Sequence, residues 1–183
     1  MCSSDLGRKL EYKGIATLIE AVTRLPRHLD ASLLLAGPSS AWFDKLYQDL
    51  PPALRSKIID LGVVSHADKV GLLHLAEVLV LPSRFEAFGI VLLEAWACGT
   101  PVIAAATGAL PSIVGEGGLV FEYGNAAELS EKLERLLEDV ELAKTMARTG
   151  RERLLEEYAW AKIAAAAKTA YSRGRRKRRR RRL

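Results

Sequence analysis

Several classes of protein are excluded by residues that this sequence lacks. It has only two cysteines, Cys2 and Cys98, so we expect no disulfide framework, which suits a reducing cytosol. No apolar run reaches the roughly 18 residues that a membrane span needs, and no signal-peptide pattern is visible. The histidines, His28, His66 and His74, stand apart from cysteines or acids at ligand spacing, which argues against a metal site. We therefore expect a cytoplasmic protein without metal or cofactor.

Basic residues are in the minority outside the C-terminal tail. Residues 173–183 hold eight arginines and Lys177, and without these nine the formal charge falls from +5 to −4. Such a block is expected to be solvated and disordered, and to bind nucleic acid or anionic lipid without sequence preference. A shifted reading frame or a sequencing artefact explains the same composition. We therefore expect no specific nucleic-acid partner.

Strand-like and helical segments alternate along the remaining 49% hydrophobic chain. This order predicts an α/β fold with a doubly wound parallel sheet in one domain, residues 7–172. Residues 1–6 contain the polar run Cys2-Ser3-Ser4-Asp5, which is unfavourable for a buried strand. We expect an irregular remnant of a missing leading strand there. The predicted strands are 32–36, 58–61, 78–81, 102–105 and 118–121, and the predicted helices are 14–25, 42–50, 68–76, 89–98, 126–137, 141–157 and 161–171.

The stretch Arg84 to Gly99, RFEAFGIVLLEAWACG, is the most informative part of the chain. It follows a buried strand and leads through a loop into a helix. In open parallel sheets ligands bind beyond the carboxyl ends of strands, where helix N-termini present free amides. Glu86 lies in the loop and Glu94 about two turns into the helix, where vicinal ribose hydroxyls would be suitable partners. The alternative is a solvated loop acid and a helix-surface acid.

The segment FEAFGIVLLEAWACGTPVIA resembles the signature of the nucleotide-sugar-dependent glycosyltransferases of family four. The resemblance runs from Gly7 to about Ala170 and implies a Rossmann-like domain, the C-terminal half of a retaining GT-B glycosyltransferase. It also implies that Glu86 contacts the transferred sugar and Glu94 the ribose. The amides expected to contact the sugar and diphosphate are those of Phe88, Gly89, Ile90 and Val91.

Three further segments extend the resemblance. Arg8 and Lys13 match the family's basic pair against the donor diphosphate, although lone basic residues near a terminus are usually solvated. Gly108 follows the next strand, in what looks like a second phosphate-facing loop. That loop departs from the family, which usually has glutamate where Ser112 stands and often glycine where Ala109 stands. His66 lies where the family packs the nucleobase, and a surface histidine is the alternative. Val64, two residues before it, is an expected donor-binding residue.

The resemblance implies a nucleotide sugar as donor substrate and a saccharide, lipid-linked or small-molecule acceptor held by a half that is missing here. It allows peripheral contact with the inner membrane face. We expect inefficient transfer by this polypeptide alone. The alternatives are a GT-B relative such as an epimerase or a phosphorylase, and a nucleic-acid-binding module that acts through the tail. A phosphorylase would need a pyridoxal-phosphate lysine, for which no pattern is visible.

Overall fold

The computed structural model describes residues 2–180, and for residues 2–6, 166 and 172–180 it describes the backbone only. The chain forms two compact units, residues 1–151 and 152–183. The first unit contains the sheet and the residues that the sequence predicts for the site. The second contains the end of the helical C-terminal region. Each unit is described by itself.

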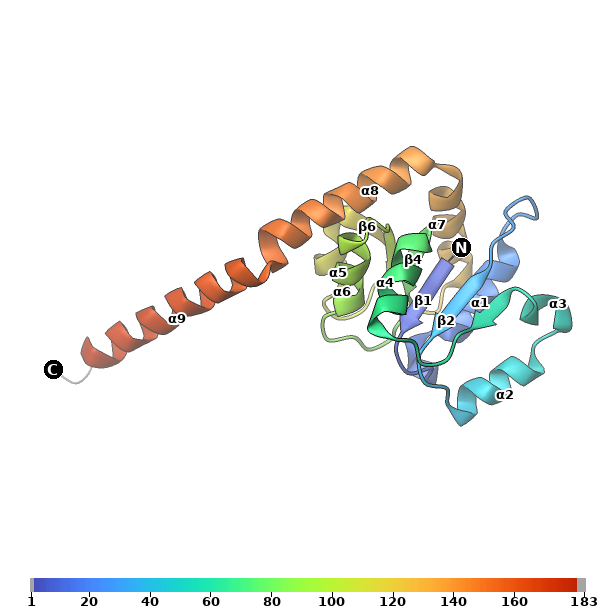
Figure 1. Ribbon diagram of the computed structural model, residues 1–183, viewed down its shortest axis with the longest axis horizontal. Helices are drawn as coiled ribbons and strands as arrows, with labels where there is room; N and C mark the ends of the chain where they lie inside the picture. The colour runs from blue at the N-terminus through green and yellow to red at the C-terminus, as the bar shows by residue number, and fades with distance from the viewer. Residues whose placement is uncertain (1, 181–183) are drawn as a thin grey trace. The chain divides into compact units, whose positions relative to one another are not determined.

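A six-stranded sheet forms the centre of the first unit, and its strands are all parallel (Figure 1). The order across the sheet is β3-β2-β1-β4-β5-β6. The predicted doubly wound parallel sheet is therefore confirmed. The strands are β1 (Cys2–Leu6), β2 (Leu33–Ala36), β3 (Ile58–Asp60), β4 (Val78–Leu81), β5 (Val102–Ala105) and β6 (Gly118–Phe121).

The expectation of an irregular segment at residues 1–6 is wrong for residues 2–6. They form β1, which pairs with β2 on one side and with β4 on the other. Cys2 lies opposite Leu33 in one pair and opposite Val78 in the other. Strand pairing uses backbone amides and carbonyls, so a central position between two strands overrides the weak strand preference of serine and aspartate. Met1 lies outside the described residues.

Helices cover both faces of the sheet in three layers, as expected when parallel strands are joined by helical crossovers. Buried residues of α1 and α7 pack with every second residue of the strands, including Leu33, Leu35, Val78 and Val80. The helices are α1 (Ile15–Arg24), α2 (Ala41–Asp49), α3 (Pro52–Arg55), α4 (His66–Leu75), α5 (Ile90–Ala97), α6 (Leu110–Val114), α7 (Ala126–Glu138), α8 (Val140–Arg153) and α9 (Trp160–Arg180), with 3₁₀ turns η1 (Glu11–Lys13) and η2 (Gly115–Gly117) and a π-helical turn η3 (Leu154–Tyr158).

Two expectations about the C-terminal region are corrected by the structure. The boundary between compact units lies at residues 151/152, not at 172/173. The tail expected to be disordered continues as helix α9 through Arg180, while residues 181–183 lie outside the described part. Alanine and arginine both favour helix, so an alanine-rich start can extend into the basic block. Within residues 2–180, none of the helices combines the length and the hydropathy needed to cross a bilayer.

Candidate functional site

The winding of the sheet reverses between β1 and β4. From β1 the chain continues to β2 and β3 on one side, whereas from β4 it continues to β5 and β6 on the other. The two loops that follow β1 and β4 are therefore neighbours at the carboxyl edge of the sheet, where this type of fold binds ligands. The first loop contains Arg8 and Lys13, and the second contains Glu86 and Phe88.

An ion pair joins these two loops. The Lys13 Nζ atom lies 3.1 Å from Glu86 Oε2, and the two side chains are only 16% and 21% exposed. Their residues are 73 positions apart in the sequence. The structure thus brings together a cation predicted to face a diphosphate and a carboxylate predicted to face a sugar.

Backbone contacts hold the 3₁₀ turn η1 against the loop after β4. The Arg84 amide donates to the Tyr12 carbonyl at 2.7 Å, and the rings of Tyr12 and Phe85 lie 6.3 Å apart. Gly14 has a φ of 73°, and a Cβ there would overlap the carbonyl group of Pro82. Glycine is therefore required on both conformational and steric grounds, and its close approach positions Lys13 beside Glu86.

A cleft of about 420 Å³ opens beside this ion pair. Gly108, in the loop after β5, has a φ of 53°, and a Cβ there would lie 2.9 Å from the Glu86 carbonyl oxygen. The neighbouring Thr107 hydroxyl donates to the Ser83 carbonyl at 2.7 Å. The loops after β4 and β5 are thus in contact. The cleft is lined by Tyr12, Arg84, Phe85, Glu86, Ala87 and Gly108.

Glu94 has a cationic partner that the sequence analysis missed. Lys69 Nζ, on α4, lies 2.6 Å from Glu94 Oε1, on α5, and the two side chains are 23% and 32% exposed. Cys98 follows Glu94 by one helical turn. Burial and, second, the negative charge of Glu94 raise the pKa of the Cys98 thiol, while Lys69 acts in the opposite direction. Glu94 is therefore a half-exposed carboxylate that already has a counter-charge.

The N-terminus of α5 points its first amides toward the same edge. Its N-cap, Gly89, has a φ of 76° and offers no side-chain acceptor to those amides. A Cβ on Gly89 would lie 2.8 Å from Leu110 Cδ2 and 3.1 Å from Leu81 Cδ2. Glycine at this position thus allows tight internal packing and a left-handed conformation. Phe88 and Ile90 are exposed here, and Val91 is half-buried.

The remaining predicted residues do not join the ion pairs. Arg8 lies in the loop after β1 and its side chain is exposed. His66 is the exposed first residue of α4. Val64 is half-buried in a groove of about 550 Å³, which it lines with Leu61 from the loop after β3 and with Leu72 and other residues of α4. Among the described side chains, no three of the histidine, cysteine, aspartate and glutamate type come together as metal ligands would.

The sequence did not predict Lys69 as the partner of Glu94, because the spacing between the two residues gives no sign of a contact. The two residues are 25 positions apart on different helices, so helical periodicity does not relate them. The available signal was indirect: a carboxylate on a mostly apolar helix needs a partner, and the preceding predicted helix contained a lysine. Only the packing of α4 against α5 identifies that lysine as the partner.

Comparison with known proteins identifies the family of this chain. Residues 5–153 match the family model described as glycosyl transferases group 1. The chain belongs to this family. Glycogen synthase of Mycobacterium tuberculosis is 33% identical over 167 residues, which cover 89% of this chain and 40% of that protein. The family match includes both ion pairs and the cleft.

Two solved structures share the architecture of this chain. Sucrose-phosphate synthase from Thermosynechococcus elongatus has a TM-score of 0.82 and 33% identity, over 94% of this chain and 45% of that chain. Anabaena Alr3699/HepE, solved in complex with UDP, has a TM-score of 0.84 and 25% identity, over 93% of this chain and 48% of that chain. The prediction of a Rossmann-like half of a GT-B glycosyltransferase is confirmed. This chain spans less than half the length of each of these three proteins.

Proposed function

We propose that this chain binds the nucleotide-diphosphate sugar of a retaining glycosyltransferase of the hexosyltransferase type. The observation that supports it is the Lys13–Glu86 ion pair, 3.1 Å long, beside the N-terminus of α5 at the reversal point of the sheet. A fixed cation and a helix N-terminus there suit a diphosphate. The adjacent carboxylate suits the hydroxyls of a sugar, as the family resemblance implies. Anabaena Alr3699/HepE, which was solved with UDP-glucose as well as with UDP, supports the choice of donor class.

The charged residues predicted for the site and the amides of α5 each have a role in the proposed reaction. Arg8, Lys13 and the amides at the start of α5 stabilise the negative charge that develops on the diphosphate, so no metal or cofactor is required. Glu86 binds the transferred sugar and Glu94 the ribose. The acceptor attacks from the leaving-group face, with a phosphate oxygen as base, which retains the anomeric configuration without an enzyme nucleophile. Removal of Lys13 should raise the barrier by about 3 to 4 kcal/mol, by analogy with oxyanion-hole donors.

The acceptor of the proposed enzyme is a saccharide, a lipid-linked sugar or a small molecule, so we assign the protein to carbohydrate biosynthesis. We place the reaction in the cytoplasm. A lipid-linked acceptor would add peripheral contact with the inner membrane face.

Thermal unfolding of the full chain with and without ligands tests the proposal. The panel is UDP, GDP, ADP and their sugars at millimolar concentration. A ligand present at about 100 times its dissociation constant should stabilise the chain by about 2.7 kcal/mol, and the preferred base would identify the donor. The proposal of donor binding fails if none of these ligands raises the unfolding temperature.

Two variants make the test specific to the site. Lys13→Met should weaken binding of the preferred nucleotide, because it removes the cation beside Glu86. Lys45→Met, on the exposed face of α2, removes the same charge elsewhere and should leave binding unchanged. Deletion of residues 173–183 should abolish any binding of nucleic acid while sparing the nucleotide. Loss of nucleotide binding with the tail would instead favour the tail as the binding module.

A further inference from the structure

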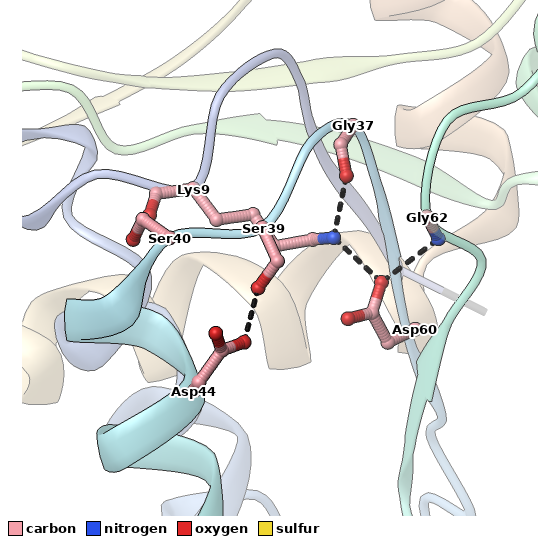
Figure 2. Close-up of polar contacts among 7 residues, drawn as sticks. All are labelled: Lys9, Gly37, Ser39, Ser40, Asp44, Asp60 and Gly62. Atoms are coloured by element: carbon pink, nitrogen blue, oxygen red, sulfur yellow. Dashed lines mark hydrogen bonds and ion pairs between the residues drawn. The ribbon is translucent and has the colours of Figure 1, made fainter.

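Lys9 is a lysine that the proposed donor site does not use, and its side chain is buried. Only 1% of the residue is exposed. Its Nζ atom donates to the Gly37 carbonyl at 2.6 Å and lies 2.6 Å from Asp60 Oδ1 (Figure 2). The ammonium group also lies 5.3 Å from the centre of the Phe43 ring. Lysine is almost never fully buried unless it is paired, so this arrangement needs a reason.

The contacts of Lys9 connect the loops that follow three neighbouring strands. Lys9 lies in the loop after β1, Gly37 directly follows β2, and Asp60 ends β3. The Lys9 amide donates to the Pro38 carbonyl at 3.1 Å, and the Ser40 hydroxyl donates to the Lys9 carbonyl. Backbone and side chain together therefore fix the loop after β1 on its neighbours.

Gly62 closes the network on the side of β3. Its amide donates to Asp60 Oδ1 at 2.9 Å (Figure 2), and its carbonyl accepts from the Gly37 amide at 2.6 Å. Asp60 thus binds Lys9 and Gly62 with the same oxygen. Val64, an expected donor-binding residue, follows Gly62 by two residues, and His66, which the family resemblance places at the nucleobase, follows two residues later. Arg8 directly precedes Lys9.

Stability alone is a weak explanation for this pair. Lys9 is buried, whereas the Asp60 side chain is 29% exposed. Replacing an ion pair of this kind by neutral residues of similar volume is often neutral or stabilising, whereas leaving the buried charge unpaired is costly. What the pair does is fix geometry, because each partner is rigidly held by a second contact. The part of the edge that carries Arg8 is thereby held at a set distance from the part that carries Val64.

We propose that Lys9 is a positioning residue that, through Asp60, sets the spacing between a diphosphate-binding loop and a nucleobase-binding loop. This inference rests on the proposed function. A nucleoside diphosphate contacts both loops at once, so its affinity depends on their spacing. A nucleoside or pyrophosphate contacts only one loop, so its affinity does not.

The test compares these ligands on the variant Lys9→Met/Asp60→Asn, which removes both charges and keeps an acceptor for the Gly62 amide. The matched control is Lys144→Met/Glu141→Gln, an ion pair on α8 with 68% and 83% exposed side chains. Titrations use the nucleoside diphosphate that the wild-type chain prefers, its parent nucleoside and pyrophosphate. Thermal unfolding verifies that each variant is folded.

We expect the Lys9/Asp60 variant to bind the diphosphate at least tenfold more weakly, with nucleoside and pyrophosphate affinities within twofold of wild type. The control should bind all three as the wild type does. Should the double variant not fold, Lys9→Met alone replaces it, because Asp60 is 29% exposed and keeps its bond with the Gly62 amide. The expected loss is then at least threefold for the diphosphate only.

Unchanged diphosphate affinity in the folded variant overturns the inference, and so does an equal loss for all three ligands, which would show general damage. Both results leave the proposed function standing, provided that the wild-type chain binds a diphosphate. If the wild-type chain binds none, the proposed function fails and the inference fails with it.

Discussion

Replacing Gly14 by alanine tests whether the close contact between the loops after β1 and β4 stabilises both the fold and the candidate site. Gly14 has a φ of 73°, and an added Cβ would overlap the Pro82 carbonyl oxygen and lie 2.9 Å from its carbon. Gly124 provides a matched control, since its φ is 84° but nothing lies within 4 Å of an added Cβ. Both substitutions incur the left-handed penalty, and only Gly14→Ala adds steric overlap.

The expected magnitudes follow from these two terms. The left-handed conformation costs an alanine about 1 to 2 kcal/mol, so Gly124→Ala should lower the free energy of unfolding by that amount. Overlap with the Pro82 backbone should add about 1 to 3 kcal/mol for Gly14→Ala. The backbone of Pro82 must move to accept the new atom, which separates Lys13 from Glu86. Gly14→Ala should therefore also weaken nucleotide binding, whereas Gly124→Ala should not.

Urea denaturation with linear extrapolation measures the free energy of unfolding of each variant. Titration of the folded variants with the preferred nucleotide, in the absence of urea, measures affinity. In a domain of this size an extra 1 kcal/mol lowers the melting temperature by about 2 to 4 °C. Equal destabilisation by both substitutions would refute the steric argument. A large loss of stability with unchanged affinity would separate the Gly14 contact from the binding site.

Four further predictions concern other parts of the first unit. Glu94→Gln should weaken nucleotide binding by about 1 to 3 kcal/mol, measured by calorimetric titration. It should change the free energy of unfolding by less than about 1 kcal/mol, because the ion pair of Glu94 with Lys69 is partly exposed. A large loss of stability with unchanged affinity would mean that Glu94 is a structural acid. Burial and the Glu94 charge raise the pKa of the Cys98 thiol. In a Cys2→Ser background, Glu94→Gln should therefore shift the pH midpoint of Cys98 alkylation to lower pH. An unchanged midpoint would contradict the effect of the Glu94 charge on this thiol. Gly150→Ala should destabilise by about 1 to 3 kcal/mol, because a Cβ would overlap the Trp96 indole. Gly71→Ala, also helical but with open space around it, should stabilise by about 0.5 to 1 kcal/mol in urea.

Periodicity and local motifs predicted the elements around the signature segment well. The predicted strand 78–81 coincides with β4, and the predicted helix 89–98 exceeds α5 by one residue at each end. These segments are apolar and are bounded by Pro82, Gly99 and Pro101, so local chemistry decides their limits. The short helices α3 and α6 were missed, because four or five residues are too few to establish a helical period.

The candidate site was only partly predictable. The sequence indicated Glu86, Glu94 and Lys13 through motif and order, and the match with group 1 glycosyl transferases covers all three. Their roles in binding stay predictions until a ligand is tested. The structure adds which of them lie together: Lys13 contacts Glu86, while Glu94 is held by Lys69.

The sequence by itself determined the alternation of strands and helices, the class of sheet and the family signature, because these depend on residues that are near one another along the chain. Only the tertiary structure decided that the polar run Cys2–Leu6 is a central strand and that Lys9 is buried against Asp60. A polar strand is stabilised by backbone pairing with two neighbours, and a buried lysine by a carboxylate 51 positions away. Neither partner is visible until the strands are placed side by side, since local preference for both segments favours solvent.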